Sequence, residues 1–95
     1  MNNISIEQLL RLHNPIIIDI RYKYDYNKGY IPTAINIPFY QLERNYIHYL
    51  NPIDIYYLYC DSGDKSKEIC NYLLNKNYNT INIIGGYEAY NNYLK

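Results

Sequence analysis

A cysteine between an apolar strand and a helix is the part of this sequence that points most directly to chemistry. The run Ile55–Tyr59 is almost wholly apolar, Cys60 ends it, and Gly63 precedes a helical pattern. Backbone N–H groups at a helix N-terminus point outward together, and the helix dipole favours negative charge there. We therefore predict that Cys60 is held as a reactive thiolate.

The loop that follows Cys60 carries the groups that a sulfur anion needs. Successive backbone N–H groups in a curved loop form an anion-binding nest, and a glycine permits backbone conformations that other residues resist. We expect the amides of residues 62–66 to form this nest. The helix dipole contributes only about 0.3–1 kcal/mol, so the amides must provide much of the stabilisation. The predicted binding loop consists of Asp61, Ser62, Gly63, Asp64, Lys65 and Ser66.

The second cysteine, Cys70, is expected to be a core residue. It falls inside the helix predicted after Gly63, whereas Cys60 precedes that helix, so a disulfide between the two is geometrically awkward. A resolving thiol is the alternative role for Cys70. The sequence has no Cys-x-x-Cys pair and only two histidines, His13 and His48, so we expect no metal site. Neither histidine is close to Cys60 in sequence, which disfavours a Cys–His protease.

Composition limits the partners that this chain can have. Its 95 residues suit a single domain, and 9 basic residues balance 9 acidic ones. This balance disfavours nucleic acid or an anionic membrane surface as the main partner. No apolar run approaches the roughly 18 residues of a membrane span, and no signal-peptide pattern begins the chain. Because two cysteines suit a reducing compartment, we expect a cytoplasmic protein.

Predicted helices and strands alternate along the chain. Residues 16–20 and 55–59 are short and apolar on both faces, which is typical of buried parallel strands. We predict helices at residues 6–12, 24–28, 41–50, 65–76 and 87–94, and further strands at residues 34–37 and 81–84. This order indicates an α/β domain with a mostly parallel sheet. Ligands bind beyond the carboxyl ends of strands in such sheets, and Cys60 lies at such an end.

Three segments, in this order, resemble the rhodanese-like domain, specifically the single-domain sulfurtransferases. They are Asp19-Ile20-Arg21 with Gly29-Tyr30-Ile31-Pro32, the loop from Cys60 to Ser66, and Ile84-Gly85-Gly86-Tyr87-Glu88-Ala89. Thr33 and Asn77 depart from the pattern, since family members often have glycine there. The resemblance implies that residues 1–95 form one rhodanese-like domain, with a mostly parallel sheet of about five strands flanked by helices on both faces.

The resemblance also implies a reaction. In the family, the cysteine thiolate takes a sulfane sulfur from a donor, becomes a persulfide and passes the sulfur to a nucleophilic acceptor. Cys60 would be this nucleophile. No cofactor is implied, and the partners would be a small-molecule or protein persulfide donor and a thiol acceptor. The oligomeric state stays open.

Four residues outside the loop are predicted to support it. Asp19 and Arg21 are expected to form a structural ion pair or hydrogen-bond anchor near the loop, and a substrate-binding role is their alternative. Gly85 and Gly86 are expected to form a turn, and this turn provides one candidate wall of the pocket.

Other functions use a related loop or the same thiolate. Rhodanese-like phosphatases have a longer loop, with arginine six positions after the cysteine. Ser66 occupies that position here, and the cation, Lys65, comes one residue earlier, where sulfurtransferases usually have arginine. The loop therefore favours sulfur over phosphate. Arsenate reduction would need a resolving thiol, and a non-catalytic rhodanese-like binding module is the main alternative.

Asp61 and Asp64 place two carboxylates in the loop against the single cation of Lys65. When both carboxylates face the pocket mouth, they repel a small dianion such as thiosulfate. We therefore hypothesise that thiosulfate is a poor donor and that a protein persulfide or a low-molecular-weight persulfide is a better one. Replacing both aspartates with asparagine should then improve the use of thiosulfate.

Overall fold

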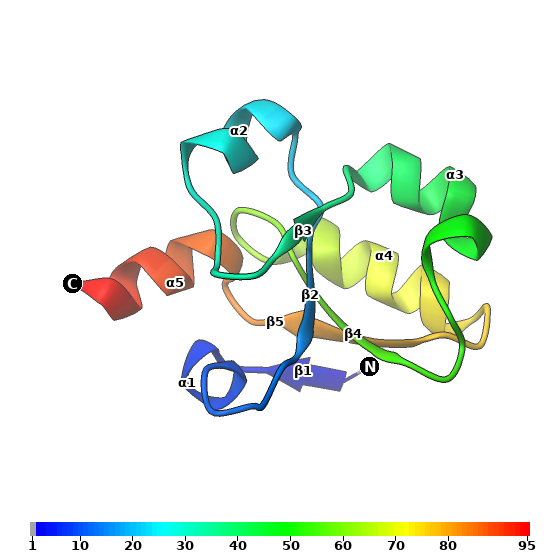
Figure 1. Ribbon diagram of the computed structural model, residues 1–95, viewed down its shortest axis with the longest axis horizontal. Helices are drawn as coiled ribbons and strands as arrows, with labels where there is room; N and C mark the ends of the chain where they lie inside the picture. Colours follow the sequence, from blue (N-terminus) through cyan, green and yellow to red (C-terminus); the bar gives the residue numbers. More distant parts are fainter. Residues whose placement is uncertain (1) are drawn as a thin grey trace.

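Five parallel strands form the central sheet of the computed structural model, which describes residues 2–95 (Figure 1). The strand order is β1-β5-β4-β2-β3. The strands are β1 (Asn2–Ile4), β2 (Ile16–Asp19), β3 (Ile35–Asn36), β4 (Ile55–Tyr59) and β5 (Asn79–Ile83). The helices are α1 (Ile6–Leu9), α2 (Lys23–Lys28), α3 (Phe39–Tyr49), α4 (Asp64–Leu74) and α5 (Gly86–Leu94). The predicted α/β class and parallel sheet are confirmed.

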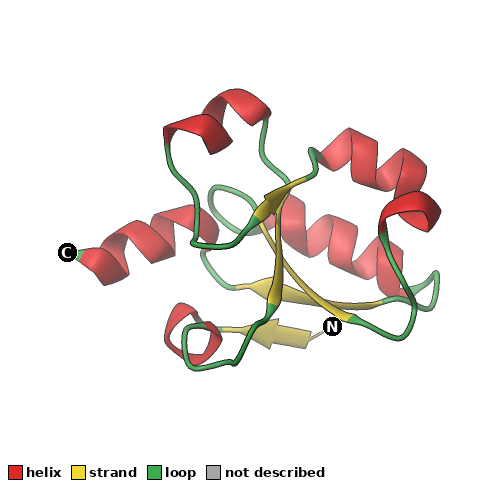
Figure 2. Cartoon of the chain, in the orientation of Figure 1, coloured by secondary structure: helices red, strands yellow, loops and turns green. Residues whose placement is uncertain are grey.

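The helices cover both faces of the sheet, as Figure 2 shows. Leu42 of α3 and Leu73 of α4 belong to one buried cluster with Leu58 of β4. On the opposite face, α1 and α5 pack together, and Ile6 joins a second cluster with Tyr59. Successive residues of a strand point to opposite faces, so β4 contributes to both clusters. This explains why residues 55–59 are apolar throughout.

The structure corrects two predictions at the N-terminus. No strand was predicted at β1, yet Asn2 and Asn3 pair with β5 at the edge of the sheet. A short, polar edge strand carries no apolar alternation, so its pattern does not reveal it. The helix predicted at residues 6–12 ends at Leu9, because the amides of Arg11 and Leu12 bond to carbonyls three residues back and the chain tightens into turns. Its capping box forms as predicted, with the Gln8 amide donating to the Ser5 hydroxyl at 3.1 Å.

Most other boundaries agree with the predictions to within two residues. Helix α3 begins two residues early, at Phe39, because Pro38 at φ −53° already has a helical φ value. After α4, the Tyr78 amide donates to the Leu73 carbonyl and the Asn77 amide to the Leu74 carbonyl. These bonds form a Schellman motif with Asn77 in the left-handed position, at φ 69°. Thr33 is also left-handed, at φ 71°. Thr33 and Asn77, the two positions where family members often have glycine, therefore both have a backbone conformation that favours glycine.

Candidate active site

Cys60 lies at the carboxyl edge of the sheet, directly after β4. The chain then turns through Gly63, at φ 109°, and α4 begins at Asp64. This φ value is strained for any residue with a Cβ atom, which is why a glycine is needed here. The turn aims the N-terminus of α4 at the thiol of Cys60, which is only 7% exposed.

Two backbone amides donate hydrogen bonds to the Cys60 sulfur. The Gly63 nitrogen lies 3.1 Å from Sγ and the Ser66 nitrogen 3.4 Å from it. The Ser66 hydroxyl oxygen lies 3.5 Å from the same sulfur. Of the five amides predicted to form the anion-binding nest, those of Gly63 and Ser66 donate to Sγ itself. Two N–H donors and the start of a helix make this a site that favours a sulfur anion.

The turn at Gly85 and Gly86 holds the loop from behind. The Tyr87 amide donates to the Cys60 carbonyl at 2.9 Å, and the Glu88 amide donates to the Asp61 carbonyl at 3.0 Å. Gly86 has φ 57°, and a Cβ atom there would collide with the Cys60 carbonyl oxygen and come within 2.8 Å of the Asp61 carbonyl oxygen. The first turn of α5 therefore packs directly against the backbone of the loop, and it does so only with glycine at residue 86.

Arg21 and Asp19 form a buried ion pair beneath the loop. The Asp19 carboxylate, which is 0% exposed, accepts from the Arg21 backbone amide at 2.9 Å and from the guanidinium at 2.8–3.1 Å. Arg21 also donates to the Gly29 carbonyl at 2.7 Å and stacks 4.1 Å from the centre of the Tyr87 ring. Burial disfavours its charge, but the hydrogen bonds and charge of Asp19 outweigh burial and raise the pKa of Arg21. These contacts favour the predicted structural role.

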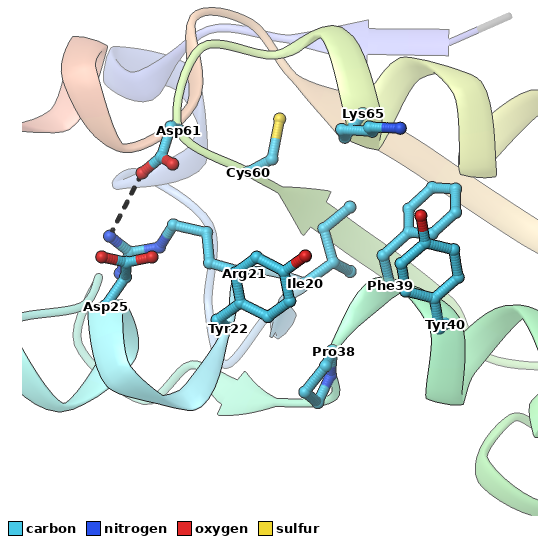
Figure 3. A pocket seen from close by; sticks show the side chains of 10 residues that line it. All are labelled: Ile20, Arg21, Tyr22, Asp25, Pro38, Phe39, Tyr40, Cys60, Asp61 and Lys65. Atoms are coloured by element: carbon cyan, nitrogen blue, oxygen red, sulfur yellow. Dashed lines mark ion pairs between the residues drawn. The ribbon is translucent and has the colours of Figure 1, made fainter.

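The same arginine reaches the loop. Its Nη1 atom lies 3.5 Å from the Asp61 carboxylate, whose side chain is 64% exposed, and Figure 3 marks this ion pair. An ion pair at such an exposed position contributes only about 0–1 kcal/mol to stability. Its main consequence is electrostatic: because Asp19 already neutralises Arg21, the charge of Asp61 is only partly balanced beside Cys60.

A cavity of about 140 Å³ opens beside Cys60. It is lined by Ile20, Arg21, Tyr22, Asp25, Pro38, Phe39, Tyr40, Cys60, Asp61 and Lys65. In Figure 3, Phe39 and Tyr40 form one side of the cavity, and Asp25, Arg21 and Asp61 lie on the other. The Lys65 ammonium lies 5.1 Å from the centre of the Phe39 ring. The cavity is therefore largely apolar, with two cations and two carboxylates at its rim.

The structure separates residues that the sequence grouped together. Asp61 and Lys65 line the cavity, but Asp64 and Ser62 line a different, shallow hollow that also includes Gly85. The sequence left open whether both loop aspartates face the mouth; Asp61 lines the cavity, whereas Asp64 lines the other hollow. Gly85 and Gly86 support the loop from behind and do not line the Cys60 cavity.

Sequence reasoning missed most of the apolar wall. Tyr22 and Asp25 follow β2, and Phe39 and Tyr40 follow β3, so all four come from segments beyond the carboxyl ends of neighbouring strands. The rule that ligands bind at this edge of a parallel sheet was a usable signal for these positions. Applying this rule to Cys60, however, requires knowing that β2 lies between β3 and β4.

Cys70 is a core residue, as predicted. Its side chain is 0% exposed, and burial raises the pKa of its thiol to about 12. The thiol therefore stays protonated and unreactive across physiological pH. Both cysteines are free, and the inert state of Cys70 disfavours its alternative role as a resolving thiol.

This buried thiol predicts a loss of stability in alkaline solution. An unfolded thiol releases its proton near pH 9, whereas the folded one holds it to about pH 12. Between these values the native state binds more protons than the unfolded state, so the free energy of unfolding falls as pH rises. Urea denaturation at pH values from about 8 to about 11 measures how steeply the free energy of unfolding falls with pH. Cys70→Ala should make this slope less steep, and part of it should remain because burial also raises the pKa of Tyr59. An unchanged slope would contradict the assignment.

Among residues 2–95, no group of three or more histidine, cysteine, aspartate or glutamate side chains is arranged to hold a metal ion. Within the same residues, no helix combines the length and apolar character needed to span a membrane.

Comparison with known proteins gives consistent matches. The family model described as the rhodanese-like domain matches residues 5–93. "Adenylyltransferase and sulfurtransferase uba4" from Ogataea parapolymorpha is 29% identical over 89 residues, which are 87% of this chain and 22% of that protein. The crystal structure of a rhodanese-like domain protein from Staphylococcus aureus has a TM-score of 0.83 and 29% identity, covering 94% of this chain and 90% of that chain.

A more distant neighbour supports the fold alone. The human single-domain sulfurtransferase TSTD1 has a TM-score of 0.81 at 20% identity, and the match covers 95% of both chains. By contrast, this chain spans only 20–24% of the length of the curated relatives that it matches.

Proposed function

Because this chain belongs to the rhodanese-like domain family, we propose that it transfers sulfane sulfur through a persulfide on Cys60. The observation that carries the proposal is the pair of amides, from Gly63 and Ser66, that donate to Sγ at 3.1 and 3.4 Å. They stabilise a negative sulfur at the start of a helix, where a thiolate is an effective nucleophile. The curated relative whose name includes a sulfurtransferase activity supports the same reaction class.

The proposed reaction has two displacement steps. The Cys60 thiolate attacks the outer sulfur of a persulfide donor, forming a new S–S bond as the donor thiolate leaves. An acceptor thiolate then attacks the outer sulfur on Cys60, and the Cys60 thiolate is released. No external oxidant or reductant is needed, because one S–S bond forms as another breaks in each step. The Gly63 and Ser66 amides stabilise the negative sulfur at both ends of the cycle.

The position of Ser66 supports sulfur over phosphate as the transferred group. Ser66 stands where the phosphatase loop has its arginine, and it is a buried neutral residue whose hydroxyl oxygen lies 3.2 Å from the Gly63 carbonyl oxygen. The loop cation, Lys65, lies against Phe39. Phosphoryl transfer depends on cations that clamp the phosphate oxygens, whereas the groups that hydrogen-bond to Sγ among the described residues are neutral.

The proposed partners are a persulfide donor and a thiol acceptor. A cytoplasmic setting, where thiols are kept reduced, suits both.

Intact-protein mass spectrometry after treatment with a donor tests the proposal. A low-molecular-weight persulfide should add one sulfur atom to the wild type and to Cys70→Ala, but none to Cys60→Ser. An added thiol acceptor should then remove that sulfur from the protein. If persulfides and thiosulfate all fail to load Cys60, the protein is instead a non-catalytic binding module.

Thiosulfate is still expected to be a poor donor, because carboxylates line the cavity and surround Arg21. Asp25 and Asp61 line the cavity, and Asp19 and Asp61 already pair with Arg21, which leaves little net positive charge for a dianion. Removing one rim carboxylate should raise kcat/KM with thiosulfate and cyanide by about 1.5- to 5-fold, the range for an exposed charge interaction. Asp25→Asn and Asp61→Asn are the test variants.

Asp64→Asn is the matched control, because it changes the net charge equally outside the cavity. It should leave kcat/KM with thiosulfate unchanged. An equal gain in all three variants would show that net charge decides donor choice, and a wild-type efficiency typical of dedicated rhodaneses would refute the hypothesis.

A further inference from the structure

The Ser66 hydroxyl has one proton and three possible acceptors. Its oxygen lies 2.5 Å from the Asn82 side-chain oxygen, 3.2 Å from the Gly63 carbonyl and 3.5 Å from the Cys60 sulfur. A hydroxyl donates one hydrogen bond at a time. The shortest of these contacts directs the proton to Asn82, so the sulfur receives only its two backbone amides in this arrangement.

Asn82 is a buried polar residue in the core strand β5. It is 5% exposed, and its side chain bonds to Ser66 on one side and to Asn3 on the other, where its nitrogen lies 3.4 Å from the Asn3 side-chain oxygen. A buried amide is costly unless it is hydrogen-bonded. Because Asn3 is exposed on β1, its own amide group can exchange partners with water.

An asparagine amide can supply either an oxygen or a nitrogen to the same neighbour. Rotation of the Asn82 amide by a half-turn would present its nitrogen to the Ser66 oxygen. The Ser66 hydroxyl would then accept from Asn82 and donate its own proton to the Cys60 sulfur. Asn3 can rotate in the same way and donate to the Asn82 oxygen. The hydrogen bonds that link Asn3, Asn82, Ser66 and Cys60 can thus run in two directions. One of these directions gives the sulfur a third hydrogen-bond donor.

We propose that Asn82 is a positioning residue, which acts through Ser66 to set whether the hydroxyl proton points toward or away from the Cys60 sulfur. This inference rests on the proposed role of Cys60 as a thiolate. When the sulfur is a thiol, its proton goes to the Ser66 oxygen, which donates to Asn82. When the sulfur is a thiolate, the amide turns and the hydroxyl donates to it. Asn82 therefore allows Ser66 to accept a hydrogen bond from the Cys60 thiol and to donate one to the Cys60 thiolate.

The test measures the rate of Cys60 alkylation by iodoacetamide against pH, with mass spectrometry of the Cys60 peptide. Asn82→Leu has nearly the same size but neither donates nor accepts. Without Asn82, the Ser66 hydroxyl turns to the Gly63 carbonyl, which at 3.2 Å is nearer than the sulfur at 3.5 Å. Alkylation at neutral pH should therefore slow by about 3- to 10-fold, within the range for a single net hydrogen bond, and the pH of half-maximal rate should move upward. Ser66→Ala should do the same. The double variant should be no slower than Ser66→Ala, because Asn82 acts through the serine.

Charged groups near Cys60 could also move this profile, so they stay unchanged in every variant. Arg21, Asp25, Asp61 and Lys65 line the same cavity, and Asp64 lies in the first turn of α4. Among the described residues, none of these five is a hydrogen-bond partner of Asn82.

Asn79→Leu is the matched control, because Asn79 is exposed on the same strand and bonds to the Pro52 carbonyl. Its alkylation profile should match the wild type. The proposal is overturned when Asn82→Leu leaves the profile unmoved, or when its effect multiplies with that of Ser66→Ala. Asn82→Ala serves the same comparison if the leucine variant does not fold. Alkylation reports the state of Cys60 whether or not sulfur is transferred, so it is independent of the mass test above.

Discussion

Replacing Asp19 with alanine is expected to lower the free energy of unfolding by about 3–5 kcal/mol. The Asp19 carboxylate is fully buried and receives the Arg21 amide and guanidinium. Without it, a buried guanidinium keeps its charge but loses its counter-ion, which is the costly way to break an ion pair. A domain of this size is stable by only about 5–15 kcal/mol, so the variant loses a large share of its stability. Urea denaturation followed by circular dichroism measures the change.

Two comparisons separate this effect from a general loss of negative charge. Asp25→Ala removes a carboxylate from the partly exposed cavity rim and should change stability by no more than about 1 kcal/mol. The double variant Asp19→Leu/Arg21→Met removes both charges and should be more stable than Asp19→Ala, since an apolar pair avoids the unpaired charge. If Asp19→Ala and the double variant lose the same free energy of unfolding, then lost packing, and not the broken ion pair, destabilises the protein.

The loop at Cys60 could be predicted from the sequence because its geometry is local. Residues 55–59 are apolar on both faces, which fixes a buried strand, and Gly63 permits the turn that starts α4. The position of the thiol at the sheet edge follows from these features alone. A structural ion pair or hydrogen-bond anchor of Asp19 and Arg21 near the loop was also expected; Asp19 is the last residue of β2, and Arg21 lies two residues later.

The composition of the cavity could not be predicted in the same way, because it depends on strand order. Phe39 and Tyr40 are about twenty residues before Cys60 in sequence, yet they line its cavity since β3, β2 and β4 lie side by side. No local pattern specifies that order. The same limit applies to Asn82, which reads as one polar residue in a strand and bonds to Ser66 only because α4 packs on β5.

The sequence could not decide which side of the loop each aspartate faces, for a different physical reason. Asp61 and Asp64 are three residues apart, and the loop turns between them at Gly63. The turn directs Asp61 toward Arg21 and the cavity, whereas Asp64 begins α4 and lines the hollow behind the loop. Counting charges in a loop sequence therefore overestimates the field at the thiol. The side of the loop on which each carboxylate lies decides its effect.

Gly86→Ala is expected to reduce the rate of sulfur loading on Cys60 by about 10- to 100-fold, the effect of displacing a reacting group by about 1 Å. The added methyl group would collide with the Cys60 carbonyl oxygen and crowd the Asp61 carbonyl. These atoms belong to the backbone, which cannot swing aside as a flexible side chain does. The left-handed conformation adds about 1–2 kcal/mol of strain, and overpacking adds about 1–3 kcal/mol. Stopped sulfur-loading reactions analysed by mass spectrometry measure the rate, and urea denaturation measures the stability.

The neighbouring residues provide the controls for this prediction. Glu88→Ala changes an exposed side chain in the same helical turn but keeps the amide that donates to the Asp61 carbonyl, so it should load sulfur at the wild-type rate. Gly85→Ala places its methyl group 2.8 Å from the Ala89 Cβ atom, and Ala89→Gly should partly restore its stability. No side-chain change should rescue Gly86→Ala, because its obstacle is the loop backbone itself. Normal loading by Gly86→Ala would mean that the contact with α5 does not position Cys60.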